Sequence, residues 1–166
     1  MPQDYAKVIA SLKEHQVEFV IVGGIAAVAL GAPIVTRDLD VCYRRSRENV
    51  KRLAEALAPF HPRLRGAPEG LPFRADAETI YQGCNFTFVT DAGDLDILGH
   101  VAGPGDYETI ARNAERLTIG GRKVQVMSLE DLIKAKKAAG RVKDKAQLTT
   151  LEATLALRRK SKRKRG

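Results

Sequence analysis

Apolar runs bounded by glycine and proline predict alternating strands and helices along this chain. Residues 17–22, Val-Glu-Phe-Val-Ile-Val, form a β-branched and aromatic run of strand length that stops at Gly23 and Gly24. The apolar residues 25–30 have the length of a short helix, and glycine and proline close it. This order of elements can hold a phosphate, because glycine lets the backbone approach an anion and the first helical turn offers free N–H groups. A simple tight turn also explains a Gly-Gly pair.

Two carboxylates follow within residues 36–41, Thr-Arg-Asp-Leu-Asp-Val. In a strand, Asp38 and Asp40 project from one side, whereas Leu39 and Val41 turn to the other side, into a core. Neighbouring carboxylates repel each other unless a cation lies between them. Magnesium prefers oxygen ligands and is usually held by one or two carboxylates together with substrate phosphates. The alternative is a solvated edge strand, since Asp-x-Asp is a common pattern.

A third carboxylate is expected on a later hairpin. Residues 84–90 alternate like a strand, 91–94 have the composition of a turn, and 95–98 return as a second strand. Asp96 is then the lone acid on an otherwise apolar strand, where a carboxylate is costly unless it is paired or binds a cation. Asp94 lies two residues earlier on the same face, but its place in the turn already explains it. The sequence therefore favours Asp96 as the third acid.

The remaining pattern predicts one α+β domain with a mixed sheet. Ser128 and Asp131 form a capping-box-like helix start. Other expected elements are helices at 4–15, 46–57, 106–114 and 148–157, a loop at 63–75, and a hairpin of strands 116–119 and 123–126. We assign the domain to residues 1–157, with the sheet at about 17–126, C-terminal helices at about 128–157, and a basic tail at 158–166.

The positive charge is concentrated at the end of the chain. The net charge is +8, and seven of the 28 cations lie in residues 158–165, after all 20 acids. The other 21 cations and the 20 acids leave the rest of the chain at +1. We expect the tail to be disordered and to bind RNA or another polyanion, or to serve only as a solubilising end.

Length and composition limit the class of protein. A chain of 166 residues with 44% hydrophobic residues is long enough for one sizeable core. No apolar run approaches a membrane span of about 18 to 20 residues, and the N-terminus lacks the pattern of a signal peptide. Cys42 and Cys84 belong to no metal or redox motif. We therefore expect a cytoplasmic protein without a membrane partner.

These motifs together resemble the nucleotidyltransferase superfamily related to DNA polymerase beta. The strand that ends in Gly23-Gly24, the Asp38-Leu39-Asp40 pair and the later Asp96 carry the resemblance. Within the superfamily, the chain is similar to small bacterial stand-alone members, which include the toxins of type IV toxin–antitoxin systems and minimal antibiotic nucleotidyltransferases. The resemblance covers roughly residues 17 to 155, which is most of the chain.

One departure and one further segment bear on substrate binding. Many members of the family have Gly-Ser where this chain has Gly23-Gly24, so backbone N–H groups must replace a serine contact to phosphate. The segment 128–144 is similar to a helical segment that follows the catalytic sheet in the small members. Between residues 134 and 145 there are six cations and a single acid, Asp144; the cations are Lys134, Lys136, Lys137, Arg141, Lys143 and Lys145. A solvated helix face explains most of them.

The resemblance implies a nucleotidyltransferase fold and a magnesium-dependent transfer of a nucleoside monophosphate from an NTP, such as ATP, with release of pyrophosphate. Asp38 and Asp40 would hold magnesium, and Asp96 would complete a second metal site or accept the acceptor's proton. One or two ions are thus implied. The residues expected to bind the substrate are Gly23, Gly24, Arg37, Lys136, Arg141 and Lys143, with Lys136 the first choice among the cations.

Several readings of function stay open. The acceptor implied by the resemblance is RNA such as tRNA, a protein hydroxyl or a small antibiotic, and an antitoxin protein is an expected partner of a toxin. A different class is a non-catalytic module with the same fold that binds an NTP or RNA. A metal-dependent phosphohydrolase is a further alternative, which pyrophosphate release would exclude.

Overall fold

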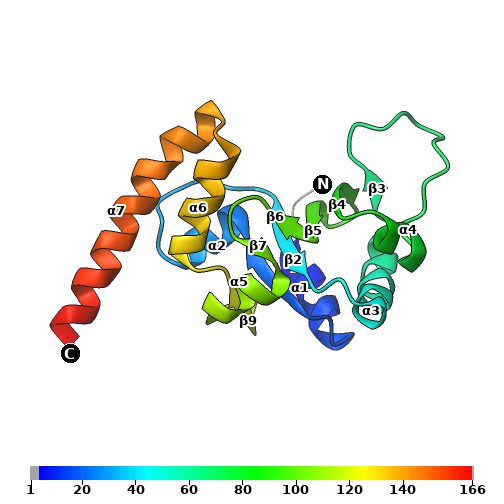
Figure 1. Ribbon diagram of the computed structural model, residues 1–166. Coiled ribbons are helices and arrows are strands. Elements are labelled where there is room, and N and C mark those ends of the chain that lie inside the picture. The colour runs from blue at the N-terminus through cyan, green and yellow to red at the C-terminus, as the bar shows by residue number, and fades with distance from the viewer. Residues whose placement is uncertain (1–3, 166) are drawn as a thin grey trace.

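A seven-stranded mixed sheet forms the centre of the computed structural model, which describes residues 4–165 (Figure 1). Its strand order is β3-β4-β5-β2-β1-β9-β8. The strands of the sheet are β1 (Phe19–Val22), β2 (Leu39–Tyr43), β3 (Arg63–Leu64), β4 (Asn85–Thr90), β5 (Gly93–Leu98), β8 (Glu115–Ile119) and β9 (Arg122–Val126). Two short strands, β6 (His100–Val101) and β7 (Gly105–Asp106), pair with each other outside it.

Helices flank the sheet, as the sequence predicts for an α+β domain. They are α1 (Tyr5–Glu14), α2 (Gly23–Ala29), α3 (Arg47–Leu57), α4 (Ala77–Gln82), α5 (Tyr107–Asn113), α6 (Leu129–Ala139) and α7 (Val142–Arg165), with a 3-10 turn at Ala58–Phe60. The predicted caps are confirmed, because the hydroxyl of Ser46 accepts from the Asn49 N–H and that of Ser128 from the Asp131 N–H. Within residues 4–165, no helix has both the length and the apolar character needed to cross a bilayer.

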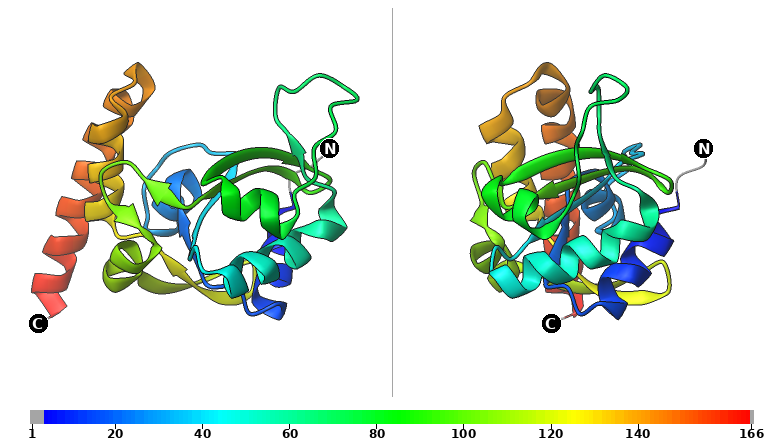
Figure 2. Two further views of the ribbon diagram at one scale, coloured as in Figure 1. Left: turned by 45° about the vertical axis from the view of Figure 1, so that its right-hand side comes forward. Right: turned by 90° about the vertical axis from the view of Figure 1, so that its right-hand side faces the viewer.

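The central strands β2 and β5 bury apolar side chains on the face opposite Asp40 and Asp96. In β2, Leu39 and Val41 are buried, and their register partners on β5, Leu95 and Ile97, are buried as well. Helices α1 and α3 lie side by side (Figure 2), where the Ser11 hydroxyl donates to a backbone carbonyl of α3. Because side chains alternate along a strand, the residues between these apolar positions project from the other face.

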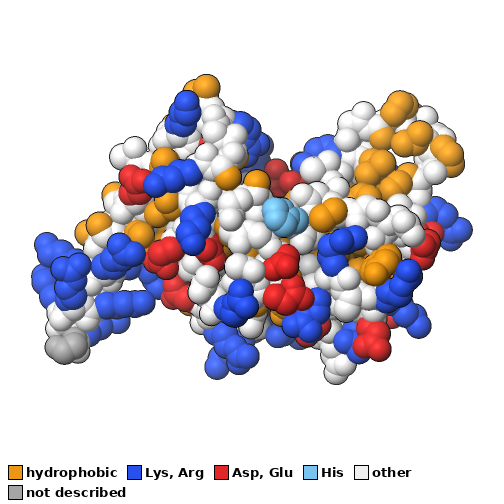
Figure 3. All heavy atoms as spheres, viewed as in Figure 1, with side chains coloured by type: hydrophobic (Ala, Val, Ile, Leu, Met, Phe, Trp, Pro, Cys, Tyr) orange, Lys and Arg blue, Asp and Glu red, His pale blue; other side chains and the backbone are white. Residues whose placement is uncertain are grey.

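The C-terminal segment differs from the prediction of a helix at 148–157 followed by a disordered tail. Helix α7 continues without a break from Val142 to Arg165 and extends away from the sheet (Figure 1). Its basic part is attached to the body through Arg158, which donates to Glu115 at 2.6 Å and to the Leu30 carbonyl at 3.3 Å. Lysine, arginine, leucine and alanine all favour helix, so nothing in 142–165 ends it. The cations gather on this helix end (Figure 3).

Candidate active site

Asp40 and Asp96 lie opposite each other on neighbouring parallel strands. The register of β2 and β5 pairs Leu39 with Leu95 and Asp40 with Asp96. Paired residues of parallel strands project from the same face, so both carboxylates leave the sheet on the side away from Leu39 and Leu95. The chain thus brings together two acids that are far apart in sequence, as predicted.

Asp38 precedes β2 by one residue and is half-buried. Its negative charge raises the pKa of both Asp40 and Asp96, which shows that the three carboxylates share one electrostatic environment. The expectation that Asp38, Asp40 and Asp96 come together is therefore consistent with the geometry. The sequence placed Asp38 inside the strand, whereas the strand begins at Leu39.

The Asp40 carboxyl is held in an unfavourable state. Burial is the main cause that raises its pKa to about 7, and the charges of Asp96 and Asp38 add to the effect. Its Oδ1 is buried and has no hydrogen-bond partner within residues 4–165. A buried carboxylate oxygen without a partner is costly, and the usual remedy is a proton or a cation.

The two glycines begin α2 directly after β1 and are in close contact with the acid face. Gly23 has a φ of +69°, and a β-carbon there would collide with the Asp40 carboxylate. A β-carbon on Gly24 would collide with the side chain of Thr36, whose hydroxyl occupies the adjoining space. Glycine is required at both positions by these contacts, which a simple tight turn does not explain.

Arg65 pairs with Asp96, although it lies in a segment expected to be a loop and was not among the predicted site residues. Its Nη2 donates to Asp96 Oδ1 at 2.9 Å and to the Phe88 carbonyl at 2.9 Å, and its Nε lies 3.5 Å from Asp94 Oδ2. The pKa of Asp96 is nevertheless raised, because burial outweighs the effect of the Arg65 charge. No periodicity marks Arg65, since it follows β3, which is only two residues long.

Lys136 and Arg141 converge on the buried carboxylate of Asp144. Lys136 Nζ lies 3.0 Å from Asp144 Oδ1, and Arg141 Nε lies 2.6 Å from Asp144 Oδ2. The charge of Lys136 also lowers the pKa of Asp40, so the α6/α7 hairpin brings a cation close to the acids. Figure 3 shows acidic side chains in the hollow between this hairpin and the 65–76 loop. These contacts make Asp144 the group that orients both cations.

Arg37 and Lys143 are less closely tied to the acids. Both side chains are exposed, although Arg37 directly precedes Asp38 in sequence. No hydrogen bond or ion pair joins either of them to the three carboxylates within the described part of the chain. They stay predictions as substrate-binding residues.

Asp38 and Asp40 together suit one magnesium ion, whereas the three acids are not arranged as a single metal site. Asp40 offers a buried oxygen without a partner, and Asp38 is a second carboxylate beside it. Hard oxygen donors of this kind suit Mg²⁺, which keeps several waters. Among residues 4–165, however, no group of three or more His, Cys, Asp or Glu side chains is arranged to hold a metal ion. Asp96 is engaged by Arg65 instead.

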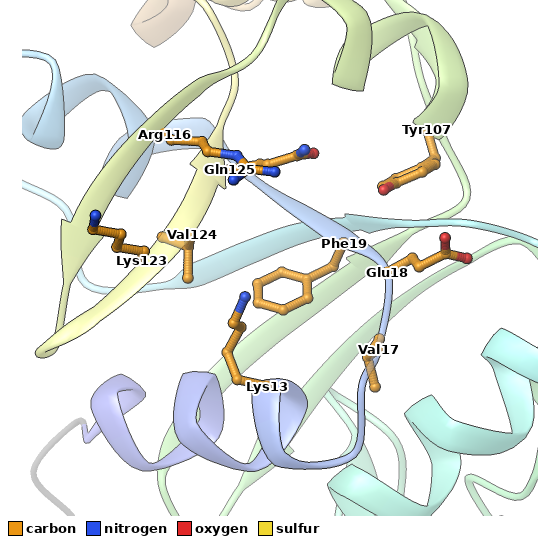
Figure 4. A pocket seen from close by; sticks show the side chains of 9 residues that line it. All are labelled: Lys13, Val17, Glu18, Phe19, Tyr107, Arg116, Lys123, Val124 and Gln125. Atoms are coloured by element: carbon orange, nitrogen blue, oxygen red, sulfur yellow. The ribbon is translucent and has the colours of Figure 1, made fainter.

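A separate pocket of about 240 Å³ lies at the start of β1. Gly23 and Gly24 follow the other end of this strand. The pocket is bordered by Phe19, Tyr107 and Gln125, with Lys13, Arg116 and Lys123 around its rim (Figure 4). None of the three acids lines it. The candidate chemistry therefore belongs to the acid face of the sheet and not to this cavity.

Comparison with known proteins gives structural neighbours only. No protein-family model matches the sequence, and no curated protein matches it significantly. A candidate nucleotidyltransferase of Thermotoga maritima is similar over 86% of both chains, with 20% identity and a TM-score of 0.56.

Two antibiotic-modifying enzymes are also similar in structure. The lincosamide antibiotic adenylyltransferase LnuA, bound to lincomycin, matches over 93% of this chain and 99% of its own, with 12% identity and a TM-score of 0.59. ANT(2″)-Ia, in complex with adenylyl-2″-tobramycin, matches over 96% and 95%, with 16% identity and a TM-score of 0.55. The chain therefore has the fold of the nucleotidyltransferases, a mixed sheet flanked by helices.

Proposed function

We propose that this chain is a magnesium-dependent nucleotidyltransferase. The observation that carries the proposal is the pairing of Asp40 with Asp96 on parallel strands, with the buried Asp40 Oδ1 lacking any partner beside the glycines of α2. A pair of acids with a buried, unpartnered carboxylate oxygen destabilises the fold unless a cation binds to it. The nucleotidyltransferase fold of the chain supports the same activity.

In the proposed reaction, an acceptor hydroxyl attacks the α-phosphorus of an NTP. A bond forms between the acceptor oxygen and the α-phosphorus, the bond to the bridging oxygen breaks, and pyrophosphate leaves. Asp38 and Asp40 would hold magnesium, which when bound stabilises charge on the phosphate oxygens. Asp96 would receive the hydroxyl proton or hold a further ion. Transfer of this kind depends mainly on positioning and charge stabilisation.

The other residues of the site act on the triphosphate. Backbone N–H groups at Gly23 and Gly24 would contact phosphate oxygens, which only glycine permits at this distance from Asp40 and Thr36. Lys136, with Arg141 and Lys143 behind it, would offset charge on the phosphates that are not transferred. Arg37 would contact the triphosphate from the segment before β2.

We propose RNA, such as the end of a tRNA, as the acceptor. The support is the basic end of α7, where six cations follow Arg158 without an acid among them. ATP as the donor and a small antibiotic as an alternative acceptor have support from the neighbours, two of which are adenylyltransferases of antibiotics. A role as a toxin with an antitoxin partner, and a cytoplasmic location, rest on the sequence resemblance alone.

The test is incubation of the purified protein with each of four α-labelled NTPs, magnesium, and either total tRNA, cell extract or an antibiotic panel. Label in a product should appear with wild type, should be lost in Asp38→Asn and Asp40→Asn, and should persist in Asp91→Asn. Asp91 is a matched control, because it pairs with His61 and Arg63 at the β4–β5 turn. NTP binding without transfer to any acceptor would instead support the non-catalytic module.

A further inference from the structure

Arg65 is fixed more firmly than a surface arginine. Its backbone N–H donates to the Thr87 carbonyl at 3.0 Å, which attaches the residue to β4. Its guanidinium then contacts Phe88, Asp96 and Asp94. Only 31% of the Arg65 side chain is exposed, and 22% of that of Asp96. A planar guanidinium held by several acceptors loses little further freedom on binding and keeps its charge at any physiological pH.

This contact places a permanent positive charge where a second metal ion would bind. Thr87 and Phe88 belong to the strand that pairs with β5, and Thr87 is the register partner of Asp96. The guanidinium therefore lies over the same stretch of sheet as the carboxylate that it contacts. A second divalent ion at Asp96 would have to displace Arg65 from Asp96 Oδ1 or lie against its charge.

The three acids are thereby divided into two groups. Asp40 Oδ1 has no partner, whereas Asp96 Oδ1 has one. The described residues, 4–165, contain no arrangement of three acids that could hold a metal ion. Resting on the proposed function, we propose that Arg65 takes the place of a second metal ion at Asp96, so that the site binds one divalent cation at Asp38 and Asp40, and Arg65 positions Asp96.

Metal stoichiometry tests this proposal without any need for turnover. The free Mn²⁺ signal in electron paramagnetic resonance would be titrated with protein in the presence of α,β-methylene ATP, which cannot be cleaved between the α- and β-phosphates. Wild type should bind one ion per chain. Arg65→Met should bind two, because Asp96 is released, and Arg65→Met/Asp96→Asn should return to one. Arg65→Lys, which retains a cation, should stay at one.

Arg63→Met is the matched control, because it removes the same charge two residues earlier in the chain but breaks a pair with Asp91. It should bind one ion. Two ions bound by wild type would overturn the proposal even if Arg65→Met failed to fold, and a single ion in a folded Arg65→Met would overturn it as well. Wild type that binds no ion in the presence of nucleotide would contradict the proposed function itself, which separates the two failures.

Discussion

Gly24 contacts Thr36 so closely that a β-carbon on the glycine would overlap the threonine side chain. Thr36 thus occupies the space that the serine of a Gly-Ser pair would take. The departure of this chain from the Gly-Ser pattern is therefore accompanied by a hydroxyl from another segment. Two residues at the site have to be considered together, because a change in either alters the space available to the other.

Gly24→Ser should lower the free energy of unfolding by about 1–3 kcal/mol, the usual cost of overpacking. In a Thr36→Gly background, which removes the colliding atoms, the same substitution should cost much less. Urea unfolding of wild type, both single variants and the double variant gives the coupling energy between the two positions. An equal cost of Gly24→Ser in both backgrounds would contradict the contact.

The raised pKa of Asp40, about 7, should make the protein less stable as pH rises in the absence of divalent ions. The native state retains a proton on Asp40 that the unfolded chain gives up near pH 4, so stability falls between about pH 4 and 7. Asp96, whose pKa is also raised, changes stability in the same direction. Urea unfolding across this range should show a smaller decrease for Asp40→Asn than for Asp91→Asn.

The same proton should compete with a cation. Since a ligand carboxylate must be ionised, Mn²⁺ affinity should rise by about tenfold per pH unit below pH 7 and level off above it. Isothermal titration of the protein with Mn²⁺ between pH 5.5 and pH 8.5 measures this dependence. An affinity that does not vary with pH would show that Asp40 is not a ligand.

Asp144→Asn should loosen the α6/α7 hairpin, because the buried carboxylate accepts from both Lys136 and Arg141. We expect a loss of about 1–3 kcal/mol, the range for hydrogen bonds to charged groups, and a higher KM for the NTP. The hydrogen bond from Arg141 lowers the pKa of Asp144 to about 2, so its stabilising contribution is present above about pH 4 and is lost as pH falls toward 2.

Glu152→Gln is the control for Asp144→Asn in the same hairpin. Its exposed pair with Lys137 spans 3.9 Å, and breaking it should change stability by less than about 0.5 kcal/mol. Chemical denaturation of the two variants measures the effect on stability, and NTP titration measures the effect on KM. If neither Asp144→Asn nor Glu152→Gln changed the KM for the NTP, the result would contradict the assignment of Lys136 to the triphosphate site.

Neutralising the basic end of α7 should weaken RNA binding and its salt dependence. The change is glutamine at Arg159, Lys160, Lys162, Arg163, Lys164 and Arg165, with Arg158 kept because it attaches the helix to the body. For single-stranded RNA, the slope of log K against log salt should fall by about 0.7 per lost phosphate contact. Filter binding at several salt concentrations measures it, with Lys51→Gln in α3 as the control. An unchanged slope would locate RNA binding elsewhere.

The parts of the fold that were predictable have strong local signals. The β1 run, the Gly23 boundary and the caps at Ser46 and Ser128 lie as expected, because periodicity and capping act over a few residues. Asp96 was expected as the third acid because it is a lone carboxylate on an apolar strand, but its register with Asp40 was not predicted, since register between distant strands has no local signature.

The contacts that could not be predicted are long-range or lack a pattern. Arg65 directly follows the two-residue strand β3, within a segment expected to be a loop, and its partner is 31 residues away. Thr36 showed no sign of its contact with Gly24, because collision depends on three-dimensional packing. The helical state of 158–165 was missed, because charge density was interpreted as disorder although the lysines and arginines of this segment favour helix.

The position of α6 and α7 at the end of the chain determines when the site is complete during synthesis. Asp38, Asp40 and Asp96 emerge from the ribosome before Lys136, Arg141 and Asp144, because translation proceeds from the N-terminus. A nascent chain can therefore fold the acid-bearing strands while it still lacks the lysine that offsets their charge. A fragment cut before residue 128 carries the acid pair without Lys136, Arg141 and Lys143, so under the proposed function it should bind an NTP more weakly than the full chain.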